Sequence, residues 1–341
     1  MGLTTAAPAT DGSGTRRRGP DAPHAGGPRG RAARALPGLA VASLVANIVI
    51  IATGGAVRLT ASGLGCPTWP ECGGGSYVAH SELGIHGAVE FGNRLLTFVL
   101  VAVVAATVTA AVAARRIRPG TLGPAVLLLA GIPVQAVIGG ITVLTQLNPW
   151  VVMVHFVASS LLVAVGTVLV LRTRPRAVPG PRAWAVARPL RGLARLVGLV
   201  VAGVVYLGTI VTGSGPHAGD LAARRTGLDP AAVSQLHADL VMLLLGLTVG
   251  LVVAVRTVPP EHRPAGAARA AGSLLGVEAG QSLVGAVQYA IGLPVGLVDL
   301  HLVGAAGVVA TAVWAVTALR APVRGRPAGQ LTPETRAAQT T

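Results

Sequence analysis

The sequence predicts an all-α integral membrane protein with eight transmembrane helices, and three observations carry this prediction. Of its 341 residues, 52% are hydrophobic and only 11% are charged, whereas soluble domains have roughly a quarter charged residues. All 27 basic residues are arginines, and they gather between the apolar runs. Each of eight apolar runs has roughly the 17–25 residues that a membrane-spanning helix needs. These runs are residues 36–56, 86–113, 121–143, 150–171, 195–213, 233–255, 271–291 and 298–319.

The distribution of arginines predicts the orientation of the chain. Of the 27, 23 lie at the two ends of the chain or in alternate loops. The opposite loops hold only Arg58, Arg224 and Arg225, and Arg94 lies within the second run. By the positive-inside rule, both termini are cytoplasmic in a multi-pass protein of the plasma membrane, with the lipid bilayer as its partner. This placement also argues against a nucleic-acid partner, despite the net charge of +15.

The apolar runs fall into two groups of four, and the spacing of polar residues indicates a duplication. Gln135 and His155 recur as Gln281 and His301, with both pairs offset by 146 residues. Four helices per half make the repeat parallel, so two parallel four-helix bundles are expected. The expected parts are a disordered cytoplasmic tail (1–35), an N-terminal half (36–171), an arginine- and proline-rich cytoplasmic linker (172–194), a C-terminal half (195–319) and a second disordered cytoplasmic tail (320–341).

Four histidines lie near the same end of four different runs: His86, His155, His237 and His301. Imidazole is costly in lipid unless it is paired or coordinated. Two histidines on facing helices can bind one haem iron from both sides, whereas a single one more often makes an interhelical hydrogen bond. A zinc or copper site is disfavoured because both cysteines lie in an outer loop. Four nearby glycines would let a flat macrocycle approach the helices: Gly246, Gly285, Gly304 and Gly307.

The second run carries a further polar face. His86, Glu90 and Asn93 are spaced i, i+4 and i+7, with Arg94 beside them. One interpretation is a carboxylate that transfers protons or orients a substrate beside a reactive centre. The other is a Glu90–Arg94 ion pair that orders the bundle.

The first outer loop carries Cys66 and Cys72 around Pro-Thr-Trp-Pro-Glu. These cysteines face the oxidising side, so we expect a disulfide, with a redox-active dithiol as the alternative. Trp69 is expected to anchor this loop at the membrane interface. His217, in the third outer loop, is expected to be solvated.

Several of these motifs resemble one known family. Arg58-Leu-Thr-Ala-Ser-Gly-Leu-Gly-Cys66-Pro-Thr-Trp-Pro-Glu-Cys72 resembles the first outer-loop signature of haem A synthases. Further segments are similar to other parts of that family and occur in the same order over about residues 36–319. They are Glu90-Phe-Gly-Asn-Arg94, Gln135-Ala-Val-Ile-Gly-Gly140, Thr212-Gly-Ser-Gly-Pro-His217 and Gln235-Leu-His237.

The resemblance implies an oxidoreductase that converts haem O to haem A for cytochrome c oxidase biogenesis, by oxidising the methyl at ring carbon 8 to a formyl group. It implies a b-type haem between His237 and His301 in the second half. It also implies a site for the substrate haem at His155 in the first half, with Glu90 as a catalytic carboxylate. The Cys66–Cys72 disulfide would support activity or transfer of the substrate haem.

The sequence departs from the family at one position. The family commonly has Glu-x-x-His-Arg in the second helix, whereas this chain has Asn93 between Glu90 and Arg94. Asparagine is a poor ligand for haem iron, and His86 lies about 10 Å further along the helix axis. Three arrangements stay open at the substrate haem. His155 is the sole protein ligand, His86 is a second ligand, or Asn93 supports a water ligand beside Arg94.

The expected mechanism passes electrons from an external donor, ferredoxin-like in kind, through the haem b to the substrate haem. An association with the enzyme that supplies haem O, haem O synthase, is a further expectation. Two other functions are compatible with the histidines. One is a bis-haem b-type membrane cytochrome that only relays electrons, and the other is a haem transporter or chaperone.

Overall fold

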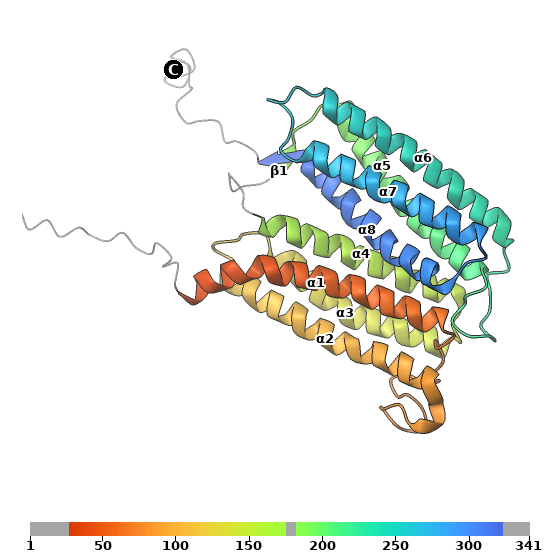
Figure 1. Ribbon diagram of the computed structural model, residues 1–341. Helices are drawn as coiled ribbons and strands as arrows, with labels where there is room; N and C mark the ends of the chain where they lie inside the picture. Colours follow the sequence, from red (N-terminus) through yellow and green to blue (C-terminus); the bar gives the residue numbers. More distant parts are fainter. Residues whose placement is uncertain (1–26, 175–181, 323–341) are drawn as a thin grey trace, which may run out of the picture.

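The computed structural model describes residues 27–174 and 182–322, and Figure 1 shows two groups of four long helices side by side. The first group consists of α1 (Pro28–Leu59), α2 (Gly84–Ala114), α3 (Leu122–Leu144) and α4 (Pro149–Thr173). The second consists of α5 (Arg188–Ser214), α6 (Pro230–Thr257), α7 (Ala267–Ala290) and α8 (Val295–Ala318). A short 3-10 helix, η1 (Ser81–Leu83), precedes α2. The predicted all-α fold is confirmed, apart from two three-residue strands, β1 (Arg182–Trp184) and β2 (Arg320–Pro322).

The side chains on the helix surfaces show why these helices belong in a bilayer. Large apolar residues point outwards, among them Phe98 and Leu199, which are 71% and 69% exposed. Small residues such as Ala111, Ser43 and Thr107 are fully buried where helices meet. Lipid gives no hydrophobic drive for helices to associate, so close packing of small residues takes its place. The protein is therefore a multi-pass membrane protein.

Seven of the eight long helices in the described ranges are long and apolar enough to cross a membrane. The exception is α7, although the sequence predicted a span there. Its 24 residues are rich in glycine, alanine and serine and also carry Arg269, Glu278 and Gln281. Glu278 is buried. These polar residues, together with the small ones, lower the hydropathy of α7, and the Glu278 carboxylate is kept from lipid by burial between neighbouring helices.

In each half the four helices pack as a closed ring. In the first half α1 packs on α2, α2 on α3, α3 on α4 and α4 on α1. The second half repeats this order from α5 to α8. As a result α2 lies diagonally opposite α4, and α6 lies diagonally opposite α8. The halves meet through α1 and α4 on one side and α5 and α8 on the other.

The turns before α4 and α8 have the same backbone conformation. Leu147 and Leu293 both have left-handed backbones, with φ of 56° and 59°. The Leu147 N–H donates to the Thr142 carbonyl at 2.8 Å, and the Leu293 N–H donates to the Gln288 carbonyl at 2.7 Å. A left-handed residue is uncommon when it is not glycine, and here it closes the last turn of a helix. The two turns lie 146 residues apart, which is the offset seen in the sequence.

Two of the expected disordered segments are partly structured. Helix α1 begins at Pro28, so residues 28–35 are helical rather than part of a disordered tail. Proline suits a first helical turn, and Ala33 and Leu36 then pack into the core of the first half. The boundary between the linker and the C-terminal half also differs from the expected one, because α5 begins at Arg188, within the segment 172–194 assigned to the linker.

The two short strands join the linker to the segment after α8. Arg182–Trp184 pairs antiparallel with Arg320–Pro322, which was expected to lie in the disordered C-terminal tail. The guanidinium groups of Arg195 and Arg320 lie 5.3 and 4.8 Å from the Trp184 ring and stabilise this pairing by cation–π contact. The expected disorder of residues 1–26 and 323–341 lies outside the described residues.

Candidate functional site

Two histidines of the second half lie on helices that face each other across the bundle. His237 belongs to α6 and His301 to α8. Each ring packs flat against a glycine of a neighbouring helix. A Cβ added to Gly208 of α5 would lie 3.2 Å from Cε1 of His237, and one added to Gly285 of α7 would lie 3.3 Å from Cε1 of His301. A larger residue at either glycine would crowd the ring and require it to shift.

The chemistry of this pair fits a haem iron with two axial imidazoles. The Nδ1 atoms of His237 and His301 are both buried and have no hydrogen-bond partner. Buried imidazoles on diagonally opposite helices are the arrangement that ligates a b-type haem inside a helical bundle. Within residues 27–174 and 182–322, no three His, Cys, Asp or Glu side chains converge as a metal cluster.

The first half contains one histidine of the same kind. His155 of α4 packs against Gly139 of α3, where an added Cβ would lie 3.3 Å from the ring Cε1. The Nδ1 atom of His155 is likewise buried without a partner. The Gly139–His155 pair lies 146 residues before the Gly285–His301 pair. Gln135 supports this helix by donating to the backbone carbonyl of His155 at 3.2 Å.

The other two candidates for the substrate haem, Asn93 and His86, have different surroundings. Asn93 of α2 accepts a hydrogen bond through Oδ1 from the Thr53 hydroxyl of α1, at 2.7 Å. His86 is exposed, and its Nδ1 lies 2.9 Å from the Ser62 hydroxyl of the first outer loop. His86 therefore lacks the glycine packing that orients the other three imidazoles.

Buried Glu90 and half-buried Arg94 form an ion pair under the loop 60–83, and we call this pair the clamp. Arg94 Nη2 donates to Glu90 Oε1 at 2.6 Å. The Cys66 backbone N–H donates to the other carboxylate oxygen at 2.7 Å. Arg94 also donates to the carbonyls of Glu71 and Thr68, at 3.2 and 3.1 Å. The ion pair that we considered as the structural alternative is thus present, and it holds the loop rather than only ordering the bundle.

The loop above the clamp is closed by a disulfide between Cys66 and Cys72, as predicted. Both cysteines are fully buried. Trp69, between them, does not simply anchor the loop at the membrane interface as expected. Its indole packs so closely on Gly140 of α3 that an added Cβ would overlap the ring. Gly140 is adjacent to Gly139, so the loop extends to the flank of the His155 site.

Most of the glycines expected to admit a macrocycle have another role. His301 covers Gly285, the Gln281 amide lies against Gly304, and Val277 lies 3.6 Å from an added Cβ at Gly307. Only Gly246 has open space beside it. The sequence shows that a glycine lies near a histidine, but not which neighbouring side chain fills the space.

A polar junction between the halves was missed by sequence reasoning. Arg58, at the end of α1, donates to the backbone carbonyls of His217 and Thr212, both at 2.6 Å. The His217 ring nitrogen Nε2 lies 3.0 Å from the Leu293 carbonyl. His217 is therefore not simply solvated as expected. The available signal was Arg58 itself, one of only three arginines in the loops that the positive-inside rule assigns to the outer side.

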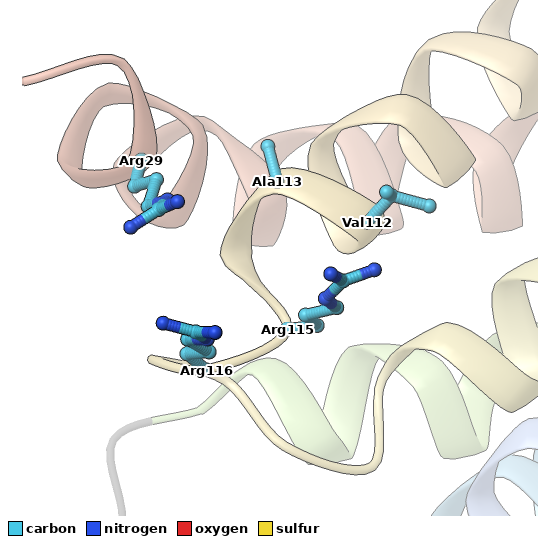
Figure 2. Close-up of a pocket in the computed structure, with 5 residues that line it drawn as sticks. All are labelled: Arg29, Val112, Ala113, Arg115 and Arg116. Atoms are coloured by element: carbon cyan, nitrogen blue, oxygen red, sulfur yellow. The ribbon is translucent and has the colours of Figure 1, made fainter.

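The hollow shown in Figure 2 is remote from all these residues. Its lining comes from the first turn of α1 and the end of α2: Arg29, Val112, Ala113, Arg115 and Arg116. Val112 lies on the order of 30 Å along α2 from Asn93 at 1.5 Å per residue. This arginine-lined hollow is therefore not part of the candidate haem sites.

The sequence of this chain is similar to one protein family and to proteins of known function. The family COX15-CtaA, described as cytochrome oxidase assembly protein, matches residues 38–219. A haem A synthase of Geobacillus kaustophilus (strain HTA426) is 32% identical over 138 residues, which cover 39% of this chain and 41% of that protein. A haem A synthase of Geobacillus thermodenitrificans is 28% identical over 141 residues, or 41% and 44% of the two chains.

These matches span less than half the length of the curated relatives. The family match includes the clamp, the disulfide loop and His155, and it ends in the loop after α5, before His237 and His301. It nevertheless covers more than half of the chain. The protein therefore belongs to the COX15-CtaA family of cytochrome oxidase assembly proteins.

Proposed function

We propose that this protein is a haem A synthase, an oxidoreductase that converts the C8 methyl of haem O to a formyl group for cytochrome c oxidase biogenesis. Family membership and the two curated relatives support the reaction. The observation that carries the proposal is the set of three imidazoles packed on glycines, at His155, His237 and His301. Two of them suit a resident haem b, and the third suits a substrate haem in the other half.

We propose further that the two halves are parallel repeats that cross the membrane eight times, with both termini in the cytoplasm. The matching turns at Leu147 and Leu293 and the equal offset of the two Gly–His pairs support the duplication. The arginine distribution supports the orientation. A crossing by α7 is supported by its length, which equals that of α8, and by its packing against α6 and α8.

In this proposal His237 and His301 hold the haem b, which when bound relays single electrons. The electrons come from an external donor of the ferredoxin kind on the arginine-rich cytoplasmic side. His155 binds the substrate haem opposite the α2 face that carries Asn93 and Arg94, with His86 nearer the outer rim. Haem O synthase is the enzyme that would supply the substrate.

Glu90 acts in this scheme first as a positioning group. Both of its carboxylate oxygens are engaged, one by Arg94 and one by the Cys66 N–H. While these bonds hold, the carboxylate keeps the Cys66–Cys72 loop, and with it Trp69, against the flank of the His155 site. Proton transfer by Glu90 would require Arg94 to release it.

Extraction of the pigments from the purified full-length protein, followed by reverse-phase separation, tests the proposal. Haem B together with haem O, a hydroxylated intermediate or haem A is the expected result. Two equivalents of haem B alone would overturn the proposal in favour of an electron relay. Protein without tightly held pigment would overturn it in favour of a transporter or chaperone.

A further inference from the structure

Three histidine rings in this protein pack on a glycine of a neighbouring helix. At the corresponding position between α1 and α2, a threonine and an asparagine are hydrogen bonded instead. Thr53 of α1 and Gly208 of α5 each lie six residues before the last residue of their helices. Gly208 carries the ring of His237, from the neighbouring helix α6. Thr53 instead hydrogen bonds to Asn93, from the neighbouring helix α2. The Thr53–Asn93 pair therefore stands where the second half has an imidazole on a glycine.

The hydrogen bond determines what Asn93 can offer to a ligand. The Thr53 hydroxyl donates to Asn93 Oδ1 at 2.7 Å, which engages one of the two lone pairs of the amide oxygen and orients the amide. In the described part of the chain no group accepts a hydrogen bond from the Asn93 amide nitrogen. This nitrogen has two N–H donors and no lone pair for iron. Asn93 is thus presented as a hydrogen-bond donor and not as a metal ligand.

The other candidate for a second ligand is held elsewhere. His86 lies in the first turn of α2, about 10 Å from Asn93 along the helix axis at 1.5 Å per residue. Its ring is exposed and bonded to Ser62 of the outer loop. His155 lies on α4, diagonally opposite α2. A haem ligated by His155 would therefore have α2, the helix that carries Asn93, on the side opposite its imidazole ligand.

We propose that the Thr53–Asn93 pair keeps one face of the substrate haem iron free of any protein ligand and gives that face an N–H donor for a small oxygen-containing ligand. The inference rests on the proposed function and deepens it, because it makes the first half the only half open to oxygen. An open sixth position is what haem proteins use to bind oxygen, and a distal hydrogen-bond donor tunes that binding. The bis-histidine site of the second half stays closed and suits electron transfer only.

Two exchanges between the halves test the proposal. Asn93→His should close the open face, and His237→Asn should open the other haem. The measurement is carbon monoxide binding to the reduced, full-length protein, purified with its pigments from cells that make haem O. In the wild-type protein we expect the haem O pigment to bind carbon monoxide and the haem b not to.

In Asn93→His, carbon monoxide binding by the haem O pigment should fall at least tenfold, with a new low-spin spectrum. In His237→Asn, the haem b should gain carbon monoxide binding. A wild-type haem O pigment that is low-spin and inert to carbon monoxide would overturn the inference, while the pigment extraction would still support the proposed function. An extract without haem O or haem A would instead overturn the proposed function.

Thr53→Val gives a second test that does not change iron coordination. Without the threonine donor the Asn93 amide is free to rotate, so the C–O stretching frequency of bound carbon monoxide should shift. Thr109→Val is the matched control, because Thr109 is an exposed α2 residue whose hydroxyl bonds only to its own helix, at Ala105. An unchanged frequency in Thr53→Val would contradict the donor role of the Thr53–Asn93 pair.

Discussion

The two halves have the same ring of helices but differ at their outer ends. In the first half the i, i+4 pair Glu90–Arg94 is buried and clamps a disulfide-closed loop. In the second half the i, i+4 pair Gln235–Asp239 of α6 is exposed, and its 2.7 Å hydrogen bond stays within the helix. Helix α6 starts from the simple cap of Asp229, whose carboxylate accepts from the N–H groups of Ala231 and Ala232.

The comparison indicates that the two halves have different functions, one binding a resident cofactor and the other a substrate. A histidine pair without a covering loop suits a cofactor that stays bound. A single imidazole beside a clamped loop suits a molecule that enters, reacts and leaves, because the loop can be held or released as one unit. The following predictions test this difference, beginning with the largest expected effect.

His301→Ala should abolish the low-spin haem b spectrum and lower turnover by more than about 100-fold. Loss of groups that only support metal ligands already costs roughly 10–100-fold, and the ligand itself matters more. The measurements are the reduced-minus-oxidised spectrum and haem A formation. His262→Ala is the control, since this exposed loop histidine should leave both unchanged. A normal haem b spectrum in His301→Ala would contradict the proposal that the second half holds the haem b.

Glu90→Ala should stop haem A formation and keep the haem b spectrum. The substitution removes the carboxylate that binds both Arg94 and the Cys66 N–H, so the loop loses two of its bonds to α2. Hydrogen exchange should show the backbone of the Cys66–Cys72 loop opening faster. Glu82→Ala, which removes an exposed carboxylate from the segment just before α2, is the matched control. If Glu90→Ala made haem A at the wild-type rate, the clamp would have no functional role.

Gly285→Ala should weaken haem b binding about tenfold. The added methyl would lie 3.3 Å from the His301 ring and push it from its present position, and overpacking of this kind costs about 1–3 kcal/mol. Titration of the haem-depleted protein with haem b measures the affinity. Gly280→Ala is the control on the same helix, because nothing lies within 4 Å of its added Cβ. Equal affinities in the two variants would show that glycine packing does not orient the imidazole.

His217→Ala should have the smallest effect, a loss of about 1 kcal/mol in the free energy of unfolding, since it removes one hydrogen bond between two outer loops. Both haem spectra should be unchanged, because His217 lies in the junction and not at a haem site. Thermal unfolding followed by absorbance measures the loss. His217→Gln should restore most of it, as an amide can donate to the Leu293 carbonyl.

Much of this architecture was predicted from local patterns. Each of the eight apolar runs corresponds to a long helix, and for seven of these helices length and hydropathy are sufficient for a membrane span. The cysteine pair could be predicted to form a disulfide because both residues share one short loop on the oxidising side. The recurrence of Gln135 and His155 indicated a repeat, and the Gly–His contacts have the same spacing in the structure.

The start of α1 and the two short strands could not be predicted from local sequence patterns. Residues 28–35 have the arginine, proline and glycine content of a tail, and they are helical because Ala33 and Leu36 find a core to pack against. The strand β2 similarly depends on β1, a partner more than 130 residues away. The local composition of a segment carries no information about a partner so distant in the sequence.

Sequence alone determined that this chain crosses a membrane as long helices, that Gln135 and His155 recur 146 residues later, and that an asparagine stands between Glu90 and Arg94. These features depend on residue type and spacing, which act over a few residues of the same chain. Only the tertiary structure decided that three of the histidines rest on glycines, that Thr53 engages the oxygen of Asn93, and that Arg58 joins the halves. Those contacts form between helices that are distant in sequence, and they exist only once packing has selected which faces meet.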